Sequence, residues 1–123
     1  QQTVLEENQE YIPKSITEKI KHVKDHLLED AEERPVLQQL AREHGLSLTQ
    51  LKTGFKQIYG ETPYAYLRRY RMHRAAAILL NTDKKIGDVS QELGYQNASK
   101  FAEAFQHVMG VTPLQYRNQG KSM

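Results

Sequence analysis

The sequence contains no cysteine, and its longest uninterrupted apolar run extends only from Ala75 to Leu80. The absence of cysteine excludes disulfide bonds and thiolate metal sites, and it leaves the redox compartment undetermined. The apolar run is far shorter than the roughly 20 residues that a helix needs to cross a bilayer. The N-terminus is polar and acidic, unlike a signal peptide. We therefore expect a cytoplasmic protein.

The sequence also lacks the motifs on which most enzyme sites are built. It shows no glycine-rich phosphate loop, no nucleophile elbow and no paired carboxylates. His22 and His26 lie one helical turn apart, a spacing that can bind metal, but no cysteine or third histidine lies nearby in the sequence. We expect both histidines to face solvent, and we expect neither an enzyme nor a metal or cofactor site.

Charge is unevenly distributed along the chain. With 38% hydrophobic and 26% charged residues, the composition is typical of a globular domain, and the net charge is only +2. Residues 1–36 nevertheless carry −4, from five Lys/Arg and nine Asp/Glu. Residues 37–123 carry +6, from twelve Lys/Arg and six Asp/Glu. Such an asymmetry is expected when one part of a chain faces a polyanion.

The N-terminal part of the chain carries two helix signals. Ser15 and Glu18 have the spacing of a capping box, and apolar residues then recur at helical spacing. We therefore expect a first helix over about residues 15–28. A second, shorter helix is expected over about residues 36–44, and Gly45 is placed to close it in a left-handed conformation.

From residue 37 onward the chain contains two copies of one pattern. The first copy reads LQQLAREHGLSLTQLKTGFKQIYGETPYAYL and the second reads IGDVSQELGYQNASKFAEAFQHVMGVTPLQY. Because the one-residue difference between the copies falls in the central turn, the pattern indicates a repeated structural unit. The matched pairs are Ala41 and Ser90, Gly45 and Gly94, Leu51 and Phe101, Phe55 and Phe105, Gly60 and Gly110, Thr62-Pro63 and Thr112-Pro113, and Tyr66 and Tyr116.

Each copy has the form of a helix-turn-helix unit, with a short helix, a glycine-containing turn and a second helix. Ser47 and Asn97 are placed to cap the second helices. On a helical wheel, the large apolar residues of each second helix share one face, and polar residues occupy the opposite face. Gly54 and Ala104 lie at the edge of the apolar face, where a small residue is expected to let the preceding helix approach closely. The apolar residues are Leu51, Phe55 and Ile58 in the first copy and Phe101, Phe105 and Val108 in the second.

A long helix is expected between the two copies. Thr62 and Pro63 have the form of an N-cap and a first helical residue. The helix should run to about Leu80, a length of about 27 Å. Major-groove segments on one face of B-DNA repeat at about 34 Å, so this connector can hold two recognition helices in successive grooves. It also carries four arginines, of which we expect Arg71 to be structural.

These signals together predict an all-α fold of about seven helices, in which a long linker helix joins two helix-turn-helix subdomains. The N-terminus is expected to be a linker because it is polar and aperiodic. The expected divisions are a linker over 1–14, a first subdomain over 15–60, a linker helix over 61–81, a second subdomain over 82–118 and a tail over 119–123.

The second copy resembles the signature of the AraC/XylS family of transcription regulators. The linker-helix pattern formed by Arg71, Ala75 and Ile78-Leu79-Leu80 resembles the same family. The resemblance covers about residues 15–118. It implies a domain that binds double-stranded promoter DNA, in an activator that recruits RNA polymerase in the bacterial nucleoid. In many members a separate N-terminal domain senses a small molecule, so we expect an effector-binding domain that is missing from this chain.

The resemblance also implies roles for individual residues. Where the family often has basic residues, Glu103 and Gln106 stand here, so we expect the second unit to contribute less affinity. The family's base-reading positions fall on Thr49, Lys52 and Thr53 in the first unit and on Ala98, Ser99, Ala102 and Glu103 in the second. Contacts to the DNA backbone are expected from Ser47, Lys56, Arg68, Arg69, Arg74, Asn97, Lys100 and Gln106.

Two other functions stay open on the residues alone. An all-helical protein-interaction module would account for the helices and the duplication, but less well for the basic half of the chain and the two matched outward faces. RNA binding is disfavoured because the narrow major groove of RNA does not admit a helix. The expected function is therefore sequence-specific binding of double-stranded DNA, with two recognition helices in successive major grooves.

Overall fold

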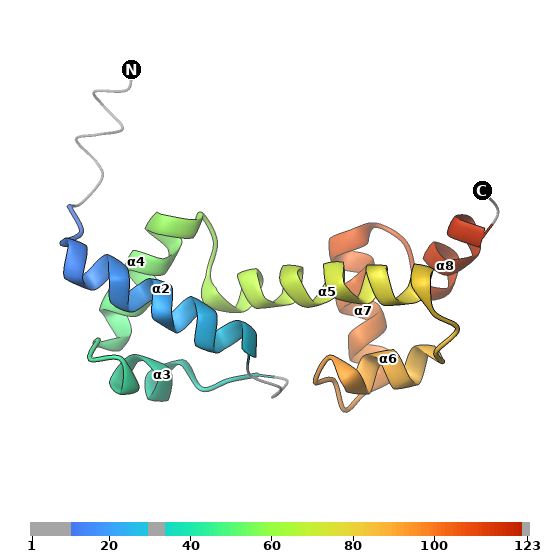
Figure 1. Cartoon of the computed structure of the whole chain (residues 1–123), viewed down its shortest axis with the longest axis horizontal. Coiled ribbons are helices and arrows are strands. Elements are labelled where there is room, and N and C mark those ends of the chain that lie inside the picture. Colours follow the sequence, from blue (N-terminus) through green and yellow to red (C-terminus); the bar gives the residue numbers. More distant parts are fainter. Residues whose placement is uncertain (1–10, 30–33, 122–123) are drawn as a thin grey trace, which may run out of the picture. The chain divides into compact units, whose positions relative to one another are not determined.

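The computed structural model describes residues 11–29 and 34–121, and within these residues it contains seven helices and no strand (Figure 1). The prediction of an all-α fold with about seven helices is confirmed for this part of the chain. The helices are α2 (Lys14–Glu29), α3 (Leu37–Glu43), α4 (Leu48–Tyr59), α5 (Pro63–Asn81), α6 (Ile86–Glu92), α7 (Ala98–Met109) and α8 (Pro113–Lys121).

The chain divides into two compact units. Among the described residues, the first unit comprises 11–29 and 35–63, and the second comprises Arg34 and 64–121. The first unit therefore contains α2, α3 and α4, and the second contains almost all of α5 together with α6, α7 and α8. Among the described residues, every helix is too short or too polar to span a lipid bilayer.

In the first unit, α2 packs its apolar stripe against α4. Ile20, Val23 and Leu27 of α2 are fully buried, as are Leu51 and Phe55 of α4. Burial of side chains of this size typically stabilises a fold by about 1.5–3 kcal/mol each. The predicted 3.6-residue periodicity of both helices is therefore realised as a shared core.

The beginning of α2 differs from the prediction. The helix starts at Lys14, and the carbonyl of Pro13 accepts hydrogen bonds of 3.0 Å from the amides of Ile16 and Thr17. Ser15 consequently lies inside the first turn. The prediction that Ser15 caps this helix is wrong, because the carbonyl of Pro13 already receives the first helical amides.

The turns of the two helix-turn-helix units have the same hydrogen-bonding pattern. Gly45 and Gly94 both adopt left-handed conformations, with φ of 72° and 88°. In the first unit the amide of Leu46 donates to the carbonyl of Ala41 at 2.8 Å, and in the second the amide of Tyr95 donates to that of Ser90 at 3.0 Å. This is a Schellman motif, which satisfies terminal carbonyls of the first helix. The predicted left-handed cap at Gly45 is confirmed, and the sequence repeat is a structural repeat.

In the second unit, α5 forms the core together with α6 and α7. The buried core residues are Met72, Ala75, Ala76 and Leu79 of α5, Val89 of α6, Leu93 directly after α6, and Phe101 and Phe105 of α7. The aromatic rings of α7 continue this core toward α8, because the Phe105 and Tyr116 ring centroids lie 5.5 Å apart in an edge-to-face arrangement. The helix predicted as a connector is thus also a structural part of the second unit.

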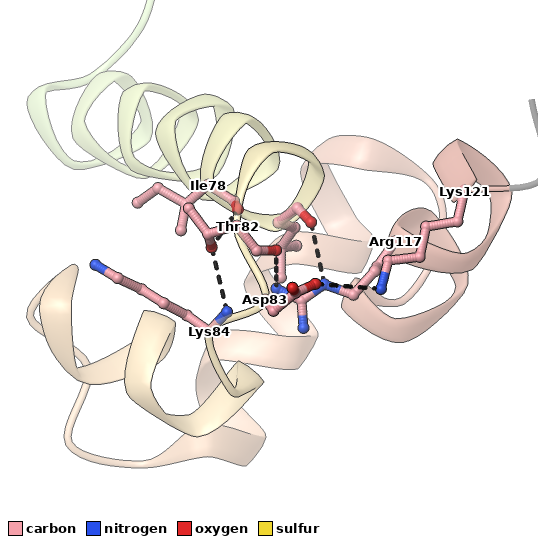
Figure 2. A network of polar contacts seen from close by, with 7 residues as sticks. Ile78, Thr82, Asp83, Lys84, Arg117 and Lys121 are labelled. Atoms are coloured by element: carbon pink, nitrogen blue, oxygen red, sulfur yellow. Dashed lines mark hydrogen bonds and ion pairs between the residues drawn. The ribbon is translucent and has the colours of Figure 1, made fainter.

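A polar network attaches α8 to the C-terminal end of α5 (Figure 2). The Nε atom of Arg117 donates to the carbonyl of Leu79 at 3.0 Å, and a terminal nitrogen of the same guanidinium donates to the carbonyl of Thr82 at 3.3 Å. The hydroxyl of Thr82 donates to the carbonyl of Ile78 at 2.8 Å. A cation at a helix C-terminus also interacts favourably with the helix dipole. The guanidinium therefore satisfies backbone carbonyls at the point where α5 ends.

His26, which was expected to face solvent, lies close to the C-terminal end of α3. Its Nδ1 atom is 3.3 Å from Nε2 of His44 and 3.8 Å from a carboxylate oxygen of Glu43. Burial lowers the pKa of His44, and the charge of His26 adds to this lowering. His22 is exposed, as expected, whereas His26 is only half-exposed. Within residues 11–29 and 34–121, no group of three or more His, Asp or Glu side chains is arranged to hold a metal ion.

Gly54 permits a close approach, but to a different helix from the one predicted. A Cβ atom at Gly54 would clash with Cδ1 of Ile20 in α2, and would lie 4.0 Å from Cδ1 of Ile12. The prediction that the preceding helix, α3, approaches at this point is wrong. A helical wheel shows which face is small, but only the packing shows that α2 covers this edge of α4.

We expect Gly54→Ala to destabilise the first unit. Ile20 is fully buried and its Cδ1 atom must shift to admit the new methyl group, so overpacking should cost about 1–3 kcal/mol, against a gain of about 1 kcal/mol in helix propensity. Gly87→Ala in α6 is the matched control, because a Cβ atom there meets nothing within 4 Å. Thermal unfolding should give a lower Tm for Gly54→Ala and an unchanged or higher Tm for Gly87→Ala. Equal shifts would contradict the close approach.

Candidate nucleic-acid interface

The second helix of the first unit, α4, is held at its N-terminus by a complete capping box. The Ser47 hydroxyl accepts from the amide of Gln50 at 3.0 Å, and the side-chain oxygen of Gln50 accepts from the amide of Ser47 at 2.9 Å. The predicted cap at Ser47 is confirmed. Because Leu51 and Phe55 are fully buried, the rotation of α4 about its axis is also determined.

The polar side chains predicted on α4 all lie on its outer surface. Thr49, Lys52, Thr53 and Lys56 are exposed. None of these four makes a side-chain hydrogen bond or ion pair within the described part of the chain, so their functional groups are available to a ligand. The first unit thus presents two ammonium groups and two threonine hydroxyls on one helical surface.

Tyr11 borders this surface and was missed by the sequence analysis, which placed it in a linker. Its side chain is 86% exposed, and it lines a hollow of about 280 Å³ together with Thr49, Gln50 and Thr53 of α4. Nothing in the local sequence distinguishes Tyr11, because its position depends on how Ile12 and Pro13 lead the chain into α2. The exposed surface of the first unit therefore extends beyond α4.

The second helix of the second unit, α7, is capped by Asn97. The side-chain oxygen of Asn97 accepts from the amides of Ser99 at 2.8 Å and Lys100 at 3.2 Å, which confirms the predicted cap. Phe101 and Phe105 are fully buried and determine the rotation of α7. Of the outward residues predicted on this helix, Ala98, Ser99, Lys100, Glu103 and Gln106 are exposed, and Ala102 is half-buried.

The arginines of α5 point to different surroundings within the second unit. Arg71 is only 5% exposed, in agreement with the predicted structural role. The guanidinium of Arg69 lies 5.3 Å from the centroid of the Tyr66 ring, and Arg74 is one of the charges that lower the pKa of Glu92, after the hydrogen bond and charge of Lys84. Arg68 is exposed and lines the same hollow as Lys100 of α7. Arg69 and Arg74 are not among the described residues that line this hollow.

Arg34 is a second residue that the sequence analysis did not identify. Its guanidinium carbon lies 4.2 Å from the centroid of the Tyr64 ring, at the beginning of α5. A cation stacked on an aromatic face at this distance is attracted by the ring quadrupole. Arg34 was not identified from the sequence because it follows an acidic stretch in a part of the chain that carries net negative charge.

Comparison with known proteins shows that this chain is similar to helix-turn-helix transcription regulators. A family model described as a helix-turn-helix domain matches residues 40–119, which is well over half of the chain. The chain is 36% identical over 85 residues to the transcriptional regulator ExsA of Pseudomonas aeruginosa, covering 69% of this chain and 30% of ExsA. It is 30% identical over 83 residues to the transcriptional activator RhaR of Mannheimia succiniciproducens, covering 68% of this chain and 30% of RhaR.

A solved structure supports the same relationship. The crystal structure of a transcriptional regulator from Chromobacterium violaceum, described as having an AraC-type DNA-binding domain, matches with a TM-score of 0.73 and 26% identity. The match covers 83% of this chain and 91% of that chain. By contrast, the chain spans less than a third of the length of ExsA and of RhaR.

We expect Asn97→Ala to destabilise the second unit, because the amides of Ser99 and Lys100 lose their acceptor. Loss of an N-cap typically costs about 1 kcal/mol. Asn97→Asp is the matched control, since it keeps an acceptor and places a negative charge at the helix N-terminus. Hydrogen exchange of the two amides should be faster in Asn97→Ala and unchanged in Asn97→Asp. If both variants behave like the original chain, the cap does not hold α7.

Proposed function

Because the chain belongs to the AraC family of helix-turn-helix transcription regulators, we propose that it reads double-stranded DNA with α4 and α7. The observation that carries this proposal is the duplication of one arrangement. In both units a capped helix buries two large apolar side chains and exposes the opposite polar face. The family is one of DNA-binding regulators and not of enzymes.

In the first unit, we assign base reading to Thr49, Lys52 and Thr53. A lysine ammonium can donate to the N7 and O6 acceptors of guanine, and threonine offers a hydroxyl to base edges and a methyl group to thymine. The exposure of all three side chains on one surface of α4 supports this assignment. Tyr11, which borders Thr49 and Thr53, lies where it can contact the same DNA segment.

In the second unit, we assign base reading to Ala98, Ser99, Ala102 and Glu103. The carboxylate of Glu103 can accept from the N4 amino group of cytosine, but it also repels nearby phosphate. Glu103 is exposed and makes no ion pair among the described residues, so neither effect is masked by a partner. We therefore propose that the second unit contributes specificity more than affinity.

Contacts to phosphate would orient the two helices without reading sequence. The amides at the N-termini of α4 and α7 are suited to this task because a helix N-terminus carries partial positive charge. We also assign backbone contacts to exposed polar and basic side chains. These are Ser47, Lys56, Arg68, Arg69, Arg74, Asn97, Lys100 and Gln106.

We further propose that the two reading helices occupy successive major grooves. The 19-residue length of α5, about 28 Å at 1.5 Å per residue, is compatible with the roughly 34 Å repeat of the groove. Since the reading residues of α4 and α7 differ, the DNA site would be asymmetric. One chain would then contact two groove segments, for which many helix-turn-helix proteins need a dimer.

The activity of the whole regulator is also a proposal, because this chain covers less than a third of the length of ExsA and of RhaR. We propose an activator of transcription that works with RNA polymerase on promoter DNA in the bacterial nucleoid. The activator role of the relative RhaR supports this. An effector-binding domain would lie in a part of the protein outside this chain.

Salt dependence of DNA affinity tests the proposed function directly. Each phosphate neutralised on duplex DNA adds about −0.9 to the slope of log K against log salt. With six to ten such contacts, affinity should fall by about 10³–10⁵ between roughly 50 and 200 mM salt. The measurement is a titration of a duplex selected from a random pool, with an unselected duplex of equal length as the control. No DNA affinity at any salt concentration would instead favour a protein-interaction module.

Lys52→Ala should weaken binding to the selected duplex by about 1–3 kcal/mol if Lys52 contacts a base, with a smaller effect on the unselected duplex. Lys21→Ala is the matched control, because Lys21 is an exposed lysine of α2 in the same unit. Fluorescence anisotropy on both duplexes gives the two affinities. Equal losses for both variants would mean that only net charge matters, which contradicts base reading by Lys52.

A further inference from the structure

A hollow of about 780 Å³ lies in the second unit, between the first half of α5 and one flank of α7. Leu67, Arg68 and Arg71 of α5 form one side, and Lys100 and His107 of α7 form the other. The hollow is large enough for a ligand but is open to solvent, so an extended occupant fits it better than an enclosed molecule.

The charged groups that line this hollow are mostly basic. They include the guanidinium groups of Arg34, Arg68 and Arg71 and the ammonium group of Lys100, and among the described residues Glu103 supplies a single carboxylate. Neither Arg68 nor the Lys100 side chain makes a hydrogen bond or ion pair with another described residue. Arg68 and Lys100 thus line one hollow without a carboxylate partner among the described residues, and an anionic occupant would offset their mutual repulsion.

Arg34 and Tyr64 also line the hollow. The 4.2 Å stacking of the Arg34 guanidinium on the Tyr64 ring restricts this side chain, so less entropy is lost when it binds an anion. Guanidinium groups present donors that match the oxygens of phosphate. Arg34, although it lies outside every described helix, thus contributes a positioned cation to a surface of the second unit.

The hollow adjoins the helix to which we assign DNA reading. Lys100 and His107 lie two turns apart on one flank of α7, and Glu103 and Gln106 connect this flank to the outer face. A helix in the major groove of DNA, which is about 12 Å wide, has the phosphates of one strand along each flank. The cations of the hollow therefore lie where one of these two backbones would pass.

We propose that this hollow binds the phosphate backbone of one DNA strand, and that Arg34 is a further DNA-contacting residue. The inference rests on the proposed function and adds to it a second backbone-binding surface beside α7. Arg34 and Arg68 donate to phosphate oxygens from the α5 side of the hollow, and Lys100 contacts the same strand from α7. Because these contacts involve no base, they strengthen binding to any sequence.

The test removes charge from two lining residues of the hollow. Arg34→Gln, Arg68→Gln and the double variant are compared with Lys121→Gln, which removes one exposed charge at the opposite end of α5, where Lys121 lies 3.5 Å from Asp83. Affinities are measured over a range of salt concentrations on the selected and the unselected duplex. Thermal unfolding of each variant establishes that the fold is retained.

Each hollow variant should weaken binding to both duplexes to a similar extent and should reduce the salt slope by about 0.9, with a double reduction in the double variant. Lys121→Gln should leave affinity and slope unchanged. A selected duplex with single phosphates replaced by uncharged methylphosphonates provides a second readout. Replacement of the phosphate that Arg68 contacts should weaken binding by the original chain but not by Arg68→Gln.

The outcomes separate this inference from the proposed function. If the original chain binds the selected duplex and Lys52→Ala weakens it, while the double variant keeps the original slope, the hollow does not bind DNA and the inference is overturned. An acidic protein segment would then be the occupant that its charge favours. If the original chain binds no duplex, the proposed function itself fails.

Discussion

The structure depends on the burial of two large apolar side chains in each reading helix. Leu51 and Phe55 anchor α4, Phe101 and Phe105 anchor α7, and all four are fully buried. Rotation of either helix by one residue, about 100°, would expose these side chains to water and bring polar residues toward the core. The position of every outward side chain follows from this constraint. The buried side chains of each unit therefore decide which polar side chains the candidate interface presents.

Local hydrogen bonds fix where the helices of each unit begin and end. Schellman motifs after α3 and α6 end the first helix of each unit in the same way, and side-chain caps at Ser47 and Asn97 begin the second. The two units nevertheless differ in their third helix. In the first unit α2 crosses α4 at Gly54, whereas in the second α5 supplies the core and is itself terminated by Arg117 from α8. One repeated motif is thus stabilised by two different partners.

The two exposed surfaces differ in charge as well as in packing. The outer face of α4 carries Lys52 and Lys56, whereas α7 carries Glu103 on its outer face and its basic groups on a flank. A phosphate backbone attracts the first arrangement directly, and it attracts the second mainly through the basic flank. The proposed asymmetric DNA site therefore rests on this difference in charge, because the two units share one helix-turn-helix arrangement.

Residue spacing was enough to predict the helices, the repeat, the glycine turns, the caps at Ser47 and Asn97 and the outward position of most candidate residues. These features depend on neighbours within one or two helical turns, so periodicity and spacing reveal them. The tertiary structure alone decided that Gly54 faces α2, that Pro13 displaces Ser15 as the start of a helix, and that Arg34 stacks on Tyr64. Such contacts join residues far apart in the chain or depend on the path of an irregular segment, and neither leaves a periodic pattern in the sequence.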